Sequence, residues 1–127
     1  MLEAELHRCE QVGGSVALLL IELDDIERLT AAEPVATVDV LVATFVHAVR
    51  AAVRRQDALV LDGTGRAWIV ARDTDRAGVQ ALGSRIAGQV GSAADWRDVP
   101  MTVSIGIGVL GEDGREARDL IGTAEES

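Results

Sequence analysis

Residues 57–71 read DALVLDGTGRAWIVA, and they hold two short apolar runs on either side of the segment Asp62-Gly63-Thr64-Gly65. Runs of Val, Leu, Ile and Trp around such a segment predict a β-hairpin, because glycine supplies the backbone angles that the turn needs. The hairpin tip is the first candidate for a functional site. The alternative is a plain connecting turn, which is the common role of an isolated Asp-Gly pair.

Composition limits the class of protein. A chain of 127 residues with 48% hydrophobic residues is long enough for one folded domain with one core. Only 2% of the residues are aromatic, so the core has to be built from Leu, Val, Ile and Ala. The 12 basic and 21 acidic residues give a net charge of −9, which argues against nucleic acid and anionic lipid as partners. A small anion remains a possible ligand, since a few arginines in one pocket override the overall charge locally.

The single cysteine, Cys9, excludes an internal disulfide and favours a reducing compartment, with the side chain as a small apolar filler on a helix. The N-terminal residues lack the features of a signal peptide, and no apolar run approaches the roughly 18 residues of a membrane span. The sequence therefore predicts a cytoplasmic domain with no membrane segment.

Apolar periodicity predicts the elements in order. Helices are expected from Leu2 to before Gly13, from Asp25 to Ala32, from Thr37 to Arg55 with Thr37 as its cap, from Arg76 to Val90 and from Arg115 to Ser127. Strands are expected at Val16–Leu23, in the two arms of the hairpin and at Val99–Leu110, and residues 91–98 are expected to form a loop. This order predicts an α/β fold, a mixed sheet with the first and last strands at its centre and helices on both faces.

Two features of the predicted strands concern their surroundings. Val16–Leu23 is continuously apolar, which is typical of a strand covered on both faces. In the last strand, Thr102, Ser104, Gly106 and Gly108 alternate with apolar residues, so that one face is nearly bare and a helix can lie close to it.

Charged residues at the ends of elements have both a functional and a structural interpretation. Glu22, Asp24 and Asp25 close the first predicted strand, where carboxylates can hold Mg²⁺ if phosphates supply further ligands. The structural alternative is a solvated strand end. Arg54 and Arg55 fall in the last turn of the long predicted helix, where they suit the negative end of its dipole.

In this order the segments resemble the GGDEF domain of diguanylate cyclases, which join two GTP molecules into cyclic di-GMP. The resemblance covers residues 2–126 and is carried by LLLIELDDI at residues 18–26, by Asp57 and the Gly63 hairpin, and by TVSIGI at residues 102–107. It implies a single degenerate domain over residues 1–127 with a nucleotidyl cyclase-like fold. The family's usual opening stretch and its closing segment, with the Lys and Arg that grip phosphates, are absent from residues 1–127.

The signature of the family is degraded. Gly63-Thr64-Gly65-Arg66-Ala67 stands where the family reads Gly-Gly-Asp/Glu-Glu-Phe. The resemblance implies that residues 65 and 66 should be a metal-binding carboxylate and an essential acid, but they are Gly65 and Arg66. A guanidinium beside a cation site adds repulsion where the triphosphate has to be neutralised.

Other positions follow the family only in part. Glu22 replaces the first Asp of the metal pair and Asp24 matches the second, so both are vestigial ligands. Thr30 replaces the Asn that reads guanine, whereas Asp39 matches the second guanine contact. No catalytic residue is therefore expected, and Mg²⁺ is expected only if nucleotide binding survives.

A product-binding site is the feature most nearly intact. Arg54-Arg55-Gln56-Asp57 matches the Arg-x-x-Asp of the family's inhibitory site for cyclic di-GMP, and Arg85 stands near the place of its second arginine. Guanidinium groups suit forked contacts to phosphate and stacking on purines. A purely structural role for these residues is the alternative.

Three hypotheses for function follow. The leading one is an inactive GGDEF-like domain that acts as a regulatory or interaction module in cyclic di-GMP signalling, with a protein partner or a second copy. The second is a cyclic di-GMP receptor that uses Arg54, Asp57 and Arg85, and the third is a residual GTP binder or cyclase. Trp68 on the hairpin and Trp96 in the predicted loop are candidate protein contacts, with packing over the edge of the core as the alternative.

Overall fold

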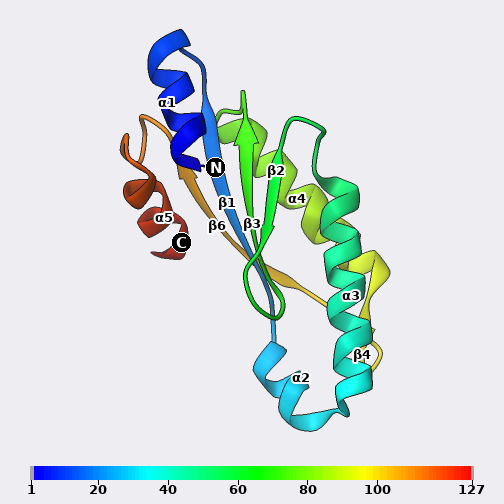
Figure 1. Ribbon diagram of the computed structural model, residues 1–127. Coiled ribbons are helices and arrows are strands. Elements are labelled where there is room, and N and C mark those ends of the chain that lie inside the picture. The colour runs from blue at the N-terminus through cyan, green and yellow to red at the C-terminus, as the bar shows by residue number, and fades with distance from the viewer. Residues whose placement is uncertain (1, 127) are drawn as a thin grey trace.

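The computed structural model describes residues 2–126 and shows one four-stranded sheet with helices on both faces (Figure 1). The elements are α1 (Leu2–Val12), β1 (Val16–Leu23), α2 (Ile26–Ala32), α3 (Val35–Ala52), β2 (Ala58–Leu61), β3 (Arg66–Arg72), α4 (Arg76–Ala93), β6 (Val103–Val109) and α5 (Ala117–Glu126). Two short strands, β4 (Asp95–Trp96) and β5 (Val99–Pro100), pair separately between α4 and β6. The α/β fold class with helices on both faces is confirmed.

The order of the strands is β2-β3-β1-β6, and every pair among the described strands is antiparallel. The prediction of a mixed sheet was therefore wrong, since the sheet is antiparallel. The prediction that the last strand lies at the centre was also wrong, because β6 lies at an edge. The reason is that each helical crossover skips one strand: β3 separates β1 from β2, and β1 separates β3 from β6. β1 is central as predicted, and seven of its eight residues are buried.

Alternate side chains of β1 serve two cores on opposite faces. Leu19 and Ile21 pack with α3 and α4 through residues such as Phe45 and Ile86. Leu18 packs in a smaller cluster with residues of α1 and α5, among them Leu6, Cys9 and Leu120. In Figure 1, α1 and α5 accordingly lie on one face of the sheet and α3 and α4 on the other. Cys9 is buried, as its role of filler predicts.

The bounds of α3 differ from the prediction. The helix begins after Pro34 rather than at Thr37, and it ends at Ala52, so that Arg54 and Arg55 lie beyond it. Proline favours a helix start because it lacks the N–H that a first turn cannot use. The prediction that Arg54 belongs to the last helical turn is therefore wrong.

Within residues 2–126, α3 is the one helix long and apolar enough to cross a membrane, with 18 residues and a mean hydropathy of 1.6. The prediction of no such run missed it, because isolated polar residues interrupt the segment. Length and composition are weak evidence for a membrane span, since the core helix of a soluble domain passes the same test. Here Phe45, Ala48 and Val49 of α3 lie in the core of the domain.

The region before β6 also differs from the prediction. Helix α4 continues to Ala93, and residues 95–100 form the β4–β5 hairpin in place of a loop and the start of a long strand. Its turn residues Arg97 and Asp98 have positive φ angles of 53° and 63°. The bare face of β6 is confirmed: a methyl group at Gly106 or Gly108 would overlap the backbone carbonyl of Ala124 or Leu120 in α5.

Candidate functional site

The tip of the β2–β3 hairpin is fixed against the end of β1. The Leu23 N–H donates to the Gly65 carbonyl at 2.7 Å, and the Asp62 N–H donates to the Arg66 carbonyl at 2.9 Å. Gly65 has a φ of +71°, and a Cβ there would lie 3.2 Å from Leu23 Cβ, so the conformation favours glycine. The predicted hairpin is thus present, and its tip lies beside the carboxylates that end β1.

Arg66 lies among three carboxylates from different elements. Its Nη2 is 3.2 Å from Glu125 Oε2 in α5, its Nε is 3.2 Å from Asp62 Oδ2, and its Nη1 is 3.9 Å from Glu22 Oε2 in β1. The guanidinium also lies 5.5 Å from the centre of the Trp68 ring, whose Nε1 donates to Asp62 Oδ2 at 3.0 Å. Arg66 therefore supplies positive charge where these carboxylates meet.

Asp24, at the other side of the β1 end, is directed toward β6. Its Oδ2 accepts a hydrogen bond from Thr102 Oγ1 at 2.7 Å, and its Oδ1 accepts one from Ser104 Oγ at 2.6 Å. Glu22 and Asp24 thus have different partners, one cationic and one hydroxylic. Within the part of the chain that the structure describes, no three His, Cys, Asp or Glu side chains are grouped to hold a metal ion.

A groove of about 650 Å³ lies between α2, α3 and the hairpin tip. It contains Thr30, Asp39 and Thr64, so the structure brings together the two positions at which the sequence predicts guanine contacts. The Thr30 hydroxyl donates to the Ile26 carbonyl at 2.7 Å within α2. The remaining lining is apolar apart from Glu27, and no basic side chain lines the groove.

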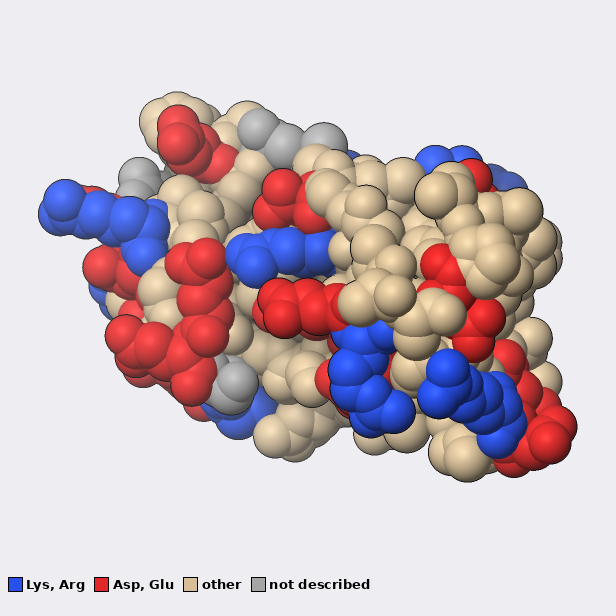
Figure 2. All heavy atoms as spheres, turned by 90° about the horizontal axis from the view of Figure 1, so that it is seen from below, with Lys and Arg blue, Asp and Glu red and all other residues tan. Residues whose placement is uncertain are grey.

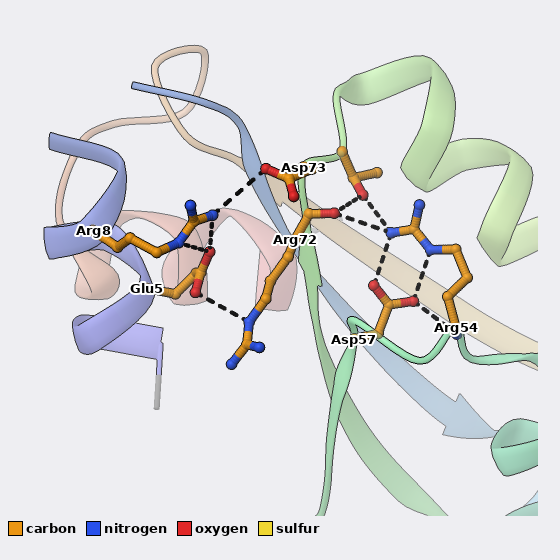
Figure 3. A network of polar contacts seen from close by, with 7 residues as sticks. Glu5, Arg8, Arg54, Asp57, Arg72 and Asp73 are labelled. Carbon is orange, nitrogen blue, oxygen red and sulfur yellow. Dashed lines mark hydrogen bonds and ion pairs between the residues drawn. The ribbon is translucent and has the colours of Figure 1, made fainter. Parts of the chain in front are cut away.

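Arg54 and Asp57 form a closed pair just after α3 (Figure 3). Arg54 donates from Nε to Asp57 Oδ2 at 2.9 Å and from Nη2 to Oδ1 at 2.8 Å, and its backbone N–H donates to Oδ2 at 3.0 Å. The Asp57 side chain is completely buried. The hydrogen bonds that the Arg54 side chain donates to Asp57 raise the pKa of Arg54, against the opposite effect of burial.

The same guanidinium also contacts the segment that follows β3. Nη2 of Arg54 donates to the Arg72 carbonyl at 3.3 Å and to the Thr74 hydroxyl. None of the hydrogen bonds that this side chain makes to the described residues comes from Nη1. Arg85 of α4 donates from Nη2 to the Ala52 carbonyl, the last residue of α3, at 2.5 Å. The structure therefore brings Arg54, Asp57 and Arg85 to the same end of α3.

The family model that describes the diguanylate cyclase GGDEF domain matches residues 1–127. The chain belongs to the GGDEF family. No curated protein matches the sequence.

Solved GGDEF structures share the fold. A sensory box/GGDEF family protein from Caulobacter crescentus is 23% identical, with a TM-score of 0.83 over 98% of this chain and 83% of that chain. The GGDEF domain of DgcB from Caulobacter crescentus, solved in complex with c-di-GMP, is 14% identical, with a TM-score of 0.88 over 98% and 76%. Diguanylate cyclase SiaD from Pseudomonas aeruginosa, in complex with its activator SiaC, is 17% identical, with a TM-score of 0.85 over 98% and 49%.

The tryptophans of this GGDEF domain are engaged within the fold. Trp96 lies in β4 rather than in a loop, and its Nε1 donates to Glu33 Oε1 at 3.0 Å. Arg28 and Arg97 lie 5.2 and 4.8 Å from the centre of its ring. Trp96 therefore links the β4–β5 hairpin to the connection between α2 and α3.

Sequence reasoning missed two partners of the GGDEF domain's polar sites. Glu125 contacts Arg66 across 59 positions, and Arg72 contacts Arg54 through its backbone carbonyl. No local pattern marks either contact. For Thr74 the sequence held a weak signal of a polar contact, because this residue lies in the turn that starts α4. In the structure its hydroxyl donates to the Arg72 carbonyl.

Proposed function

We propose that this chain is a catalytically inactive GGDEF domain that serves as a regulatory or interaction module in cyclic di-GMP signalling. One observation carries the proposal: Arg66 is paired with Glu22, Asp62 and Glu125. Mg²⁺ in a phosphoryl-transfer site is bound by carboxylates and substrate phosphates. Here a guanidinium already neutralises the carboxylates and repels a second cation.

The surroundings support this proposal. Asp24 hydrogen-bonds through both carboxylate oxygens to Thr102 and Ser104, so binding a cation requires these contacts to be exchanged. The groove beside the tip is bordered by the carboxylates of Glu27 and Asp39 and has no arginine to offset a triphosphate. Interaction with a protein is supported by diguanylate cyclase SiaD, which shares this fold over 49% of its chain and was solved in complex with its activator SiaC.

The test is incubation of the domain with GTP and Mg²⁺, followed by chromatography of the nucleotides. We expect no cyclic di-GMP, whereas a GGDEF domain with an intact signature, assayed in parallel, forms it. Formation of product above a blank without protein would overturn the assignment as inactive.

We further propose, as a second candidate, that the domain is a receptor for cyclic di-GMP. The observation that favours it is the position of Arg54, Asp57 and Arg85 at one end of α3, with the Arg54 side chain 32% exposed. Asp57 fixes the plane of the guanidinium by accepting from Nε and Nη2, and a fixed guanidinium plane suits stacking on a purine or a contact from Nη1 to a phosphate. The structure of DgcB with c-di-GMP supports this ligand class for the fold.

Calorimetric titration with cyclic di-GMP tests the receptor proposal. We expect heat of binding with the unmodified domain and with Arg50→Ala, an exposed residue of α3 that serves as the matched control. Arg54→Lys keeps the charge but loses the fork, and we expect it to abolish binding while the circular dichroism spectrum is preserved. Absence of heat with the unmodified domain would exclude the receptor and leave the role in protein interaction.

A further inference from the structure

The segment Arg72–Thr74, which joins β3 to α4, is held from two sides (Figure 3). From α1, Glu5 Oε2 lies 3.0 Å from Arg72 Nε, and Arg8 Nη2 lies 3.5 Å from the Asp73 carboxylate. From the opposite side, Arg54 Nη2 donates to the Arg72 carbonyl. Arg72 thus contacts α1 with its side chain and the Arg54 site with its backbone.

The contact with α1 involves buried charge. The Glu5 side chain is only 6% exposed, and its Oε1 accepts hydrogen bonds from Nε and Nη2 of Arg8. Arg72 Nε is also buried and makes no hydrogen bond, so its interaction with Glu5 is purely that of an ion pair. Without Arg72, Glu5 remains paired with Arg8 alone, and without α1 the guanidinium of Arg72, whose side chain is 42% exposed, loses this partner. The pairing of Arg72 with Val16 of β1 holds its backbone, and the docked α1 adds a contact to its side chain through Glu5 and one to Asp73 through Arg8.

The contacts of the Arg72–Thr74 segment with Arg54 orient the Arg54 guanidinium. The Arg72 carbonyl and the Thr74 hydroxyl both bond to Nη2, and the Thr74 hydroxyl itself donates to the Arg72 carbonyl at 2.7 Å. Asp73 between them has a positive φ of 50°, a conformation that needs support from its surroundings. Nη2 is thus held by this segment and by Asp57, and none of these hydrogen bonds comes from Nη1.

We propose that the docking of α1 regulates the Arg54 site, with Arg72 as the positioning residue that connects them. This inference rests on the proposed role of Arg54 in binding cyclic di-GMP. While α1 is docked, Glu5 holds Arg72 and the guanidinium of Arg54 is oriented in advance, which lowers the cost of ligand binding. When α1 separates from the sheet, the segment relaxes and the affinity falls. By reciprocity, bound ligand strengthens the docking of α1.

The decisive variant is Arg72→Met, which removes the side-chain contact with Glu5 but keeps the carbonyl that binds Arg54. Arg76→Met is the matched control, because Arg76 is exposed to a similar degree, 37% against 42%, and pairs with Glu112 and Asp113 rather than with α1. Glu5→Gln tests the same link from α1 and replaces Arg72→Met if that variant does not fold.

The first measurement needs no ligand. We expect Arg72→Met to accelerate hydrogen exchange of the α1 amides and to shift the Nε–H resonance of Arg54 in nuclear magnetic resonance spectra. Arg76→Met should do neither. Faster exchange in α1 with an unchanged Arg54 resonance would show that the two are independent and would overturn the inference.

The second measurement is titration with cyclic di-GMP. We expect Arg72→Met to weaken binding about fivefold or more, and the ligand to slow exchange in α1 of the unmodified domain. Equal affinities of Arg72→Met and the unmodified domain would overturn the coupling. If the unmodified domain binds no cyclic di-GMP, the receptor function falls, and the ligand-free measurement still decides whether α1 and Arg54 are coupled.

Discussion

Arg66 determines the charge balance at the hairpin tip. We expect Arg66→Glu to lower the free energy of unfolding by about 1 kcal/mol at low ionic strength, because partly exposed ion pairs are individually weak and the variant places like charges together. Magnesium ions should recover part of this loss, since the variant gathers four carboxylates without a guanidinium. Urea unfolding with and without Mg²⁺ measures both effects.

Arg118→Glu is the control for this residue. Among the described residues Arg118 forms an ion pair with its neighbour Glu116, and both side chains are mostly exposed. We expect a smaller loss and no response to Mg²⁺. A loss in Arg66→Glu no larger than that in Arg118→Glu would show that Arg66 is an ordinary surface residue.

At the scale of the element, the packing of α5 on β6 depends on two glycines. We expect Gly106→Ala to cost about 3 kcal/mol or more, because the methyl group overlaps the carbonyl of Ala124 and forces the whole helix away. Gly88→Ala in α4 has open space around it and should instead stabilise the protein by about 1 kcal/mol. Urea unfolding compares the two, and a neutral Gly106→Ala would contradict the close approach.

The elements also show what the sequence can predict. The apolar stripe of α3, with Phe45 and Val49, and the continuous apolar run of β1 were correctly interpreted, because periodicity and burial are properties of neighbouring residues. The end of α3 was not, because Asp57 accepts from the backbone N–H of Arg54 outside the helix. Strand order likewise depends on pairings between distant segments, so the edge position of β6 had no local signal.

The candidate site was predictable only as a set of positions. Arg54, Asp57 and Arg85 lie at the same end of α3, but their role in ligand binding stays a prediction, and the sequence did not identify the residues that they contact. Asp24 meets Thr102 and Ser104 across 78 and 80 positions, and Arg66 meets Glu125 across 59. Side-chain contacts over such separations follow from the completed fold and not from spacing in the chain.

At the scale of the whole molecule, the net charge of −9 repels nucleic acids, whose phosphate backbones are also negative. On the face drawn in Figure 2, basic side chains lie beside acidic ones rather than in one continuous patch. We therefore expect no shift of duplex DNA or RNA in gel electrophoresis at about 0.15 M salt, because binding a phosphate backbone requires clustered cations. A salt-sensitive shift comparable to that of a basic control protein would contradict this.

The pairing of Arg66 with Glu125 also limits how this sequence can change. A substitution that brings an acid to residue 66 sets two carboxylates against each other and removes a link between β3 and the last helix. Such a variant is less stable before it gains any capacity to bind metal. A mutational path from this chain to a metal-binding tip is therefore less costly when residues 66 and 125 change together, because the attraction between β3 and the last helix is then not turned into a repulsion.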